Sequence, residues 1–389
     1  MIPSLRRKFN EEFTEEKYAR FLALLNQRTG GPPQFQHNQT PCFFDPALTG
    51  KMELYGKQMV ESLLADRVYR KASNRAIPPE YNVPGEDSVP LFIQVDFGLD
   101  ENHEPKLVEI QGFPSLYAYQ PVLAACYRDA YGLELPYLPG NLTLDEYHAM
   151  LRSAIVAGHD PENVVLMEID PWRQKTSADF RLTEKICGIK TVDITQISKQ
   201  GRRLFHGGVP IHRIYNRAIV DELQRRQIAL QFDFRDDLAV EWAGHPNWFF
   251  RLSKFSLPFM KHPAVPQTRF LDDLDRVDNP ANVVLKPLFS FAGLGVVVGP
   301  TAEQIEAARG HGYIVQDRVN FTPVIDTPQG PAKVEVRVMY IWLDTLRAVN
   351  TVIRTGRGNQ MGVDHNKNMS WVGASAAFLS SSSFPAPDK

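Results

Sequence analysis

The sequence has few cysteines and no long apolar run. Its 389 residues include three cysteines, which are odd in number and far apart: Cys42, Cys126 and Cys187. This pattern argues against a disulfide framework or a cysteine-based zinc site and favours a reducing compartment. No apolar stretch approaches membrane-spanning length, and the first residues lack the apolar core of a signal peptide. We therefore expect a cytoplasmic protein without a membrane partner.

An excess of basic residues is also lacking. The chain has 43 Lys and Arg against 45 Asp and Glu, and its formal net charge is −2. Nucleic-acid binding usually needs a basic face, so we expect no nucleic-acid partner. The histidines are scattered, and none has zinc-ligand spacing with another ligand. Structural or surface roles are therefore expected for His206, His212, His245 and His365.

Two common nucleotide-binding motifs are missing. No Gly-Lys-Ser/Thr follows a glycine loop, and no Gly-x-Gly-x-x-Gly follows the first strand of the middle region. Residues 283–299 instead predict two apolar strands, with Lys286 at the end of the first. Ala292, Gly293 and Gly295 keep the connecting loop free of bulky side chains, so its backbone N–H groups could close on an anion. The segment is either a lid over a nucleotide's phosphates or an ordinary hairpin with a lysine in its stem.

Hydrophobic periodicity predicts a mixture of helices and strands. Helices are expected over 11–28, 52–68, 116–128, 144–155, 178–187, 218–230 and 301–309. Strands are expected over 91–97, 107–111, 164–169, 191–194, 211–215, 313–319, 333–342 and 346–354. From about residue 145 helices and strands alternate, which indicates an open α/β sheet.

Two carboxylates interrupt the apolar strands near the front of the chain. Asp96 lies in the first strand and Glu109 in the second, and Gln111 shares a face with Glu109. A carboxylate on a buried strand is costly unless it is paired or bound to a metal. On neighbouring antiparallel strands these three side chains would form an oxygen-rich site suited to Mg²⁺. The alternative is that both carboxylates sit at strand ends and pair with surface lysines.

An ordered set of basic and polar residues follows in the C-terminal half. It comprises Lys254, Lys286 with the glycine hairpin, Gln316-Asp317-Arg318-Val319, Glu335-Val-Arg337, Arg354 and the loop from Asn366 to Gly373. Together these residues resemble the nucleotide-binding half of the ATP-grasp superfamily. Members of that family end on an Asp followed by Glu-x-Asn, and Asp96 with Glu109-Ile-Gln111 is similar to that motif but stands near the front. The chain therefore resembles the circularly permuted branch, which includes eukaryotic glutathione synthetase and glutathionylspermidine synthetase.

The resemblance implies an ATP-dependent carboxylate–amine ligase that forms an amide or peptide bond through an acyl phosphate. Its cofactors would be ATP and Mg²⁺, and its partners a small-molecule carboxylate and a small-molecule amine. The implied catalytic residues are Arg354 and Lys286. The implied nucleotide-binding residues are Lys254, Lys286, Gly293, Gly295, Gln316, Asp317, Val319 and Arg337, and the implied metal ligands are Asp96, Glu109 and Gln111.

The resemblance also implies a fold of mixed α/β class with α+β lobes, a circularly permuted ATP-grasp fold. It would begin with an N-terminal helical region (1–85) and a metal-binding hairpin with its helix (86–140). An inserted open α/β substrate domain (141–250), the nucleotide-binding lobes (251–379) and a disordered Ser- and Pro-rich tail (380–389) would follow. The N-terminal helices could cover the substrate cleft or form a homodimer contact.

Three departures from the family pattern leave the activity open. Gln111 stands where an Asn is usual, and Ser290-Phe291 stands where the permuted synthetases carry a metal-binding Glu. Glu335 does not replace that Glu if its strand points it elsewhere. An ATP-binding protein without ligase activity, or a phosphotransferase on the same fold, are the alternatives. Structural roles also stay open: a surface position for Arg354, pairing with a neighbouring charge for Arg337, turn formation for Asn366 and Asn368, and strand-end packing, instead of an acidic-substrate pocket, for Arg213, Tyr215 and Arg217.

Overall fold

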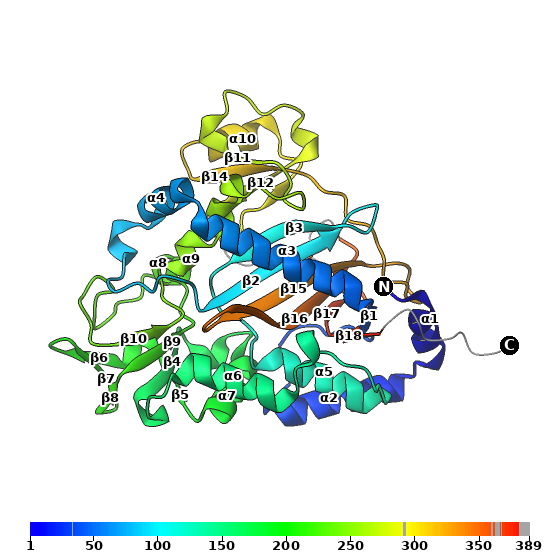
Figure 1. The fold of residues 1–389 in the computed structure, drawn as a ribbon, viewed down its shortest axis with the longest axis horizontal. Helices are drawn as coiled ribbons and strands as arrows, with labels where there is room; N and C mark the ends of the chain where they lie inside the picture. The colour runs from blue at the N-terminus through cyan, green and yellow to red at the C-terminus, as the bar shows by residue number, and fades with distance from the viewer. Residues whose placement is uncertain (33, 291–292, 359–360, 362–365, 367, 381–389) are drawn as a thin grey trace.

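A computed structural model of the chain describes residues 1–32, 34–290, 293–358, 361, 366 and 368–380 (Figure 1). Its class is mixed α/β, with α+β lobes, as expected. The helices are α1 Pro3–Glu12, α2 Glu15–Thr29, α3 Pro46–Ala65, α4 Arg67–Ala76, α5 Tyr119–Tyr131, α6 Leu144–Val156, α7 Ser177–Cys187, α8 Val220–Arg226, α9 Trp248–Arg251 and α10 Ala302–Ala308. In the described ranges none of them is both long and apolar enough to cross a bilayer.

Strands from both ends of the chain form the central antiparallel sheet. Its order is β17-β16-β15-β2-β3, formed by Gly373–Ser375, Leu346–Gly356, Lys333–Trp342, Phe92–Leu99 and Pro105–Gln111. Apolar residues alternate along these strands, and those of one face join a core with the inward side of α3. Figure 1 shows α3 lying across this sheet. The opposite face therefore carries the polar residues of the same strands.

A smaller four-stranded sheet forms the lobe above the central sheet (Figure 1). Its order is β11-β14-β12-β13, formed by Thr268–Phe270, Tyr313–Asp317, Val283–Pro287 and Val297–Val298. The hairpin predicted over residues 283–299 is confirmed, because β12 pairs antiparallel with β13. Helix α10 contributes Ile305 and Ala308 to the small core of this lobe.

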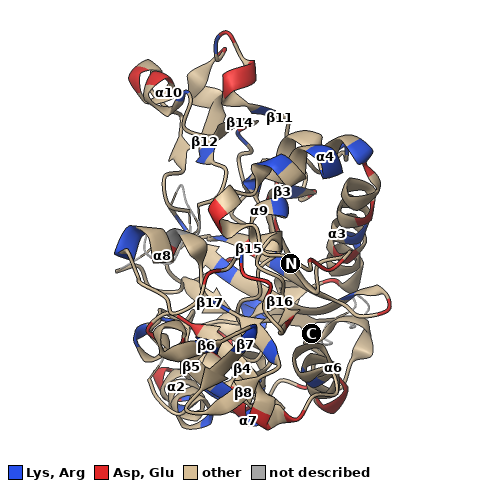
Figure 2. Cartoon of the chain, turned by 90° about the vertical axis from the view of Figure 1, so that its left-hand side faces the viewer, with Lys and Arg blue, Asp and Glu red and all other residues tan. Residues whose placement is uncertain are grey.

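The third large sheet is parallel. Its order is β10-β9-β4-β5, formed by Glu241–Ala243, Arg213–Asn216, Val164–Glu168 and Lys190–Asp193. A three-stranded sheet of β6 Ile197–Gln200, β7 Arg203–His206 and β8 Val209–Ile211 lies beside it. Strands β1 Cys42–Phe44 and β18 Ala377–Leu379 pair with each other. The alternation of helix and strand expected after residue 144 is confirmed. Acidic and basic residues are spread over all these parts of the chain (Figure 2).

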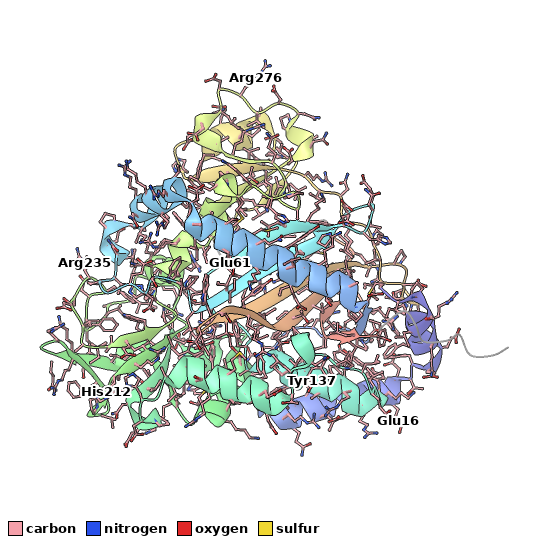
Figure 3. All side chains as sticks on the ribbon, viewed as in Figure 1. Glu16, Glu61, Tyr137, His212, Arg235 and Arg276 are labelled. Atoms are coloured by element: carbon pink, nitrogen blue, oxygen red, sulfur yellow. The ribbon has the colours of Figure 1, made fainter. Side chains whose placement is uncertain are left out.

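Several predicted boundaries are wrong. The single helix expected over 11–28 is divided, because the Thr14 side chain caps α2 by accepting the Lys17 N–H. The strand expected over 211–215 is also divided: β8 pairs with β7, whereas β9 pairs with β4. His212, labelled in Figure 3, separates the two strands and donates its N–H to Asn163. Helix α3 begins six residues earlier than expected, after Asp45, whose side chain accepts the Ala47 N–H.

The N-terminal helices are built into the core of the described chain. Phe21 of α2 stacks on Tyr127 of α5 with ring centroids 4.0 Å apart, and Phe9 of α1 lies beside Tyr131. These two helices therefore complete the face of the molecule that α5 contributes. The expected tail begins at Ser380, and residues 381–389 lie outside the described part.

Candidate functional site

The polar face of the central sheet brings together charged residues that are far apart in the sequence. Asp96 on β2 lies opposite Glu109 on β3, as predicted, and opposite Arg337 on β15. Glu335 lies opposite Arg354 on β16. Residues two apart on a strand share a face, so the five charges form one continuous cluster across four strands.

Asp96 is the centre of this cluster. Arg337 donates from Nε to Oδ1 at 2.6 Å and from Nη2 to Oδ2 at 2.7 Å, a bidentate ion pair. Arg354 donates to the same Oδ2 at 2.6 Å and also pairs with Glu335. Burial alone would raise the pKa of Asp96, but the two guanidinium groups outweigh it and hold that pKa below its ordinary value. Burial is the main cause that raises the pKa of Glu335.

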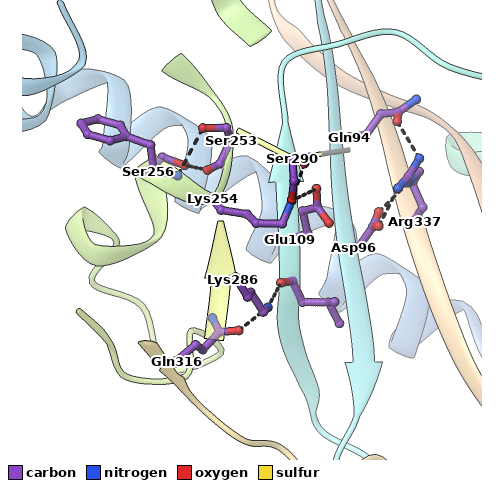
Figure 4. A network of polar contacts seen from close by, with 12 residues as sticks. Gln94, Asp96, Glu109, Ser253, Lys254, Ser256, Lys286, Ser290, Gln316 and Arg337 are labelled. Atoms are coloured by element: carbon purple, nitrogen blue, oxygen red, sulfur yellow. Dashed lines mark hydrogen bonds and ion pairs between the residues drawn. The ribbon is translucent and has the colours of Figure 1, made fainter. Parts of the chain in front are cut away.

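Two buried lysines reach this face from outside the central sheet (Figure 4). Lys254 begins a short 3-10 helix, Lys254–Phe259, and its Nζ donates to Glu109 at 3.1 Å and to the Ser290 carbonyl at 2.7 Å. Lys286 extends from β12 of the smaller sheet, and its Nζ donates to the Val108 carbonyl at 2.9 Å and to Gln316 at 2.6 Å. Burial lowers the pKa of Lys286 to about 8, an effect that Glu109 partly opposes and Lys254 reinforces.

In this arrangement each of the three predicted magnesium ligands contacts a basic side chain, and Glu109 contacts Lys254. Both oxygens of Asp96 are bonded to arginines. With its amide oxygen turned toward the guanidinium, Gln111 accepts from Arg337 at 2.7 Å and so has the same partner. In the described part of the chain, no three Asp, Glu, His or Cys side chains gather where they could hold a metal ion. The assignment of Asp96, Glu109 and Gln111 to Mg²⁺ stays a prediction.

The glycine loop of the hairpin fits tightly against its own first strand. Gly293 and Gly295 have φ of 75° and 73°, in the left-handed region that favours glycine. A Cβ on Gly295 would lie 2.9 Å from Pro287 Cγ, so a larger residue would displace the loop. Ala292 lies outside the described residues. The hydroxyl of Ser290 is buried and has no hydrogen-bond partner in the described part of the chain.

The residues expected at adenine are divided by the end of β14. The side chain of Gln316 binds Lys286, and its backbone is paired with both neighbouring strands. Asp317 is exposed, and its N–H donates to the Gln267 carbonyl at 2.8 Å. Val319 lies beyond the strand, which ends two residues earlier than predicted. The adenine assignment stays a prediction.

A second polar group lies at the carboxyl edge of the parallel sheet. Arg217 follows β9, is 3% exposed and has its guanidinium carbon 5.2 Å from the Phe113 ring and 5.5 Å from the Phe180 ring. Its Nε and Nη1 are buried without a hydrogen-bond partner in the described part of the chain. Arg213 lies at the other end of β9 and instead bonds the carbonyls of Ala154 and Ile155. Arg213 and Arg217, two of the three residues considered with Tyr215 for one substrate pocket, therefore lie at opposite ends of β9.

Three polar residues in or near these groups are not among the predicted site residues. Gln94 accepts from Arg337 at 2.9 Å, and Asp179 accepts the N–H groups of three residues before and in α5. Glu168 ends β4, and burial raises its pKa to about 8 although Arg217 opposes the shift. Alternation marks Gln94, which shares a face with Asp96. Asp179 carries no local signal, because its partners lie 60 to 63 residues earlier, whereas Glu168 accepts the N–H of the next residue, Ile169.

The comparisons with known proteins bear on the fold. Neither a protein-family model nor a curated protein matches the sequence. A similar solved structure is that of a glutathione synthetase-like effector from Globodera pallida in its apo form, with a TM-score of 0.59 and 10% sequence identity. The match covers 95% of this chain and 98% of that one. At this identity the likeness concerns the fold alone, so the chain has a fold similar to that of a glutathione synthetase-like protein.

Proposed function

We propose that the cluster of Lys254, Lys286 and Arg354 binds the phosphates of ATP, and that the protein is an ATP-dependent carboxylate–amine ligase. The observation that carries the proposal is the convergence of these cations from three elements on one polar face, one of them the first strand of the glycine hairpin. A glycine loop beside fixed cations suits phosphate binding, because backbone N–H groups of such a loop can close on an anion. Adenine would lie near the end of β14, at Gln316, Asp317 and Val319.

The circularly permuted ATP-grasp arrangement is part of the proposal. It is supported by the position of the β2–β3 hairpin, which comes early in the sequence but pairs with β15 in the central sheet. Such a rearrangement is physically tolerable when chain ends meet at the surface. The fold alone does not define the reaction, so the chemistry must be argued from the residues.

Arg217 is the proposed anchor of the acidic substrate. Two buried nitrogens of its guanidinium, Nε and Nη1, have no hydrogen-bond partner in the described part of the chain, which is costly, and a carboxylate could accept from both in a bidentate geometry. The carboxyl edge of a parallel sheet is a common ligand position. Arg217 packs on Phe113, which follows Gln111 by two residues, so an acid held there would lie next to the cation cluster.

The proposed reaction has two steps. A carboxylate oxygen of the acid attacks the γ-phosphorus while the bond to ADP breaks, which gives an acyl phosphate. The amine then attacks the acyl carbon, phosphate leaves, and the amine nitrogen loses a proton. Lys254 and Lys286 would hold the phosphates, because phosphoryl transfer depends mainly on positioning and charge. Arg354 would stabilise the charge that develops on the transferring group, a contact worth about 3–4 kcal/mol by analogy with an oxyanion donor.

The test is ADP release in the presence of candidate acids and amines, with the products identified by mass spectrometry. Lys286→Gln and Lys254→Gln should weaken ATP binding and abolish turnover, whereas Lys261→Gln, at an exposed lysine, should not. Arg217→Met should raise the KM for the acid without changing ATP affinity. Full turnover in both active-site lysine variants would refute the assignment. A phosphorylated acid with no amide product would indicate the phosphotransferase alternative.

A second function is favoured by the ion pairs of Asp96. Arg337 and Arg354 occupy this carboxylate, and Ser290 offers only a hydroxyl where the resemblance implies an acid. These features suit a protein that binds nucleotide without ligating substrates. ATP binding without ADP release under any acid and amine pair would favour this second function over the first.

A further inference from the structure

We infer that Lys254, Lys286 and Arg354 bind nucleotide phosphates without a divalent cation. Arg337 is the residue that keeps Asp96 from ligating such a cation. The inference rests on the proposed nucleotide site. It concerns the form of the ligand: free ATP rather than its magnesium complex.

Asp96 cannot ligate a cation while its present bonds last. Arg337 engages both of its oxygens, at 2.6 and 2.7 Å, and Arg354 adds a third bond at 2.6 Å. A cation bound to either oxygen would lie within a few ångströms of two guanidinium groups. Like charges at that separation repel strongly in a buried site, so the cation would have to displace at least one arginine.

The remaining protein oxygens make only a weak magnesium site. Glu335 is paired with Arg354, and Gln111 faces Arg337. Among the three described carboxylates of the cluster, Glu109 alone is not bonded to an arginine, and Lys254 occupies one of its oxygens. Magnesium usually takes one or two carboxylates in addition to phosphate oxygens and waters, so one lysine-bound carboxylate makes a weak site.

The charge of the cluster favours an anion instead. Lys254, Lys286, Arg337 and Arg354 bring four positive charges, and Asp96, Glu109 and Glu335 bring three negative ones, which leaves one positive charge. Each ammonium has three N–H donors and makes two hydrogen bonds within the described chain. One donor of each lysine is therefore left for phosphate oxygens, and these cations take the charge-neutralising place that a metal would fill.

The decisive experiment is calorimetric titration of the full chain with ATP, once in excess EDTA and once in excess MgCl₂. Equal or tighter binding in EDTA is the expected result, since free ATP carries more negative charge than its magnesium complex. A loss of affinity of about tenfold or more in EDTA, or ~1.4 kcal/mol, would overturn the inference. No binding in either buffer would overturn the nucleotide site itself, and the inference with it.

A variant tests the role of Arg337 separately. Arg337→Gln frees the bidentate side of Asp96 and should make ATP binding tighter in MgCl₂ than in EDTA. Arg347→Gln, an exposed arginine on β16, is the matched control and should behave as the wild type. Melting curves check that both variants are folded. If folded Arg337→Gln stays insensitive to magnesium, Arg337 is not what excludes the cation.

Discussion

Asp96→Asn is the substitution that best distinguishes an ion-paired carboxylate from an empty metal ligand. The asparagine is nearly the same size, but it has no charge to hold Arg337 and Arg354. In the described part of the chain, Arg354 would keep its ion pair with Glu335, whereas Arg337 would lose its ionic partner. If Asp96 were instead a metal ligand held near other carboxylates, removing its charge would relieve their repulsion and would stabilise the metal-free protein.

The expected loss of unfolding free energy is ~3–5 kcal/mol, the usual cost of removing one partner from a buried pair. The Asp96 side chain is 2% exposed, so water cannot compensate for the lost charge. Asp237→Asn is the matched control. It breaks an ion pair with Arg202 in which the two side chains are 73% and 66% exposed, and it should cost less than about 1 kcal/mol.

Urea unfolding of both variants, followed by tryptophan fluorescence, gives the two differences in unfolding free energy. Trp342 ends β15, so the signal includes the central sheet. The pH dependence adds a check on sign. Because the arginines lower the pKa of Asp96, its stabilising effect is complete above its ordinary pKa of 3.8 and is lost as the pH falls through the lowered value. A loss below about 1 kcal/mol near neutral pH, or a gain, would contradict the ion-pair account.

Three further predictions test the core and the site. Gly56→Ala on α3 should cost ~1–3 kcal/mol in urea unfolding, because its Cβ would lie 2.2 Å from the Tyr340 hydroxyl. A Cβ on Gly50 of the same helix would meet no atom of another part of the described chain within 4 Å, so Gly50→Ala should raise the free energy of unfolding by up to ~1 kcal/mol. Equal effects at both sites would contradict the packing argument. Glu168→Gln should raise the melting temperature increasingly as the pH rises from the ordinary value of 4.5 to about 8, because over that range the folded protein holds a proton that the unfolded chain has lost. A constant difference across that range would refute the raised pKa of Glu168. ATP affinity, measured by calorimetry, should fall as the pH rises through about 8, by at most about tenfold per pH unit, because Lys286 loses its charge there; a flat profile would exclude this lysine from phosphate binding.

The elements of the site could be predicted from the sequence because their signals are local. The apolar stretches on both sides of residues 288–295 define the β12–β13 hairpin, and alternation places Asp96 and Glu109 on neighbouring strands. The same alternation predicts which residues of one strand share a face. Helix ends were less predictable, since side-chain caps such as Thr14 divide a periodic run without changing its apolar pattern.

The partners of the charged residues could not be predicted, because they depend on which strands become neighbours. In the sequence, Arg337 stands two residues from Glu335 and could be expected to pair with it. The structure gives Glu335 to Arg354 and gives Arg337 to Asp96, from a strand more than two hundred residues earlier. The order of β16, β15 and β2 decides this exchange, and no local pattern records that order.

The same non-local pairing decides whether a carboxylate is a ligand or a counter-ion. When β2 and β3 are considered alone, Asp96 has the environment of a metal ligand. It lies on a buried strand, Glu109 lies opposite, and the amide of Gln111 is next on that face of β3. The guanidinium groups of Arg337 on β15 and Arg354 on β16 change this environment, because they bond the carboxylate that a cation would need. A family pattern that places a carboxylate at the position of Asp96 therefore predicts metal binding only if the neighbouring strand, here β15, leaves that carboxylate without an arginine partner. In this chain, the residue opposite Asp96 on β15 is Arg337, and the inferred binding of phosphates without a metal depends on that position.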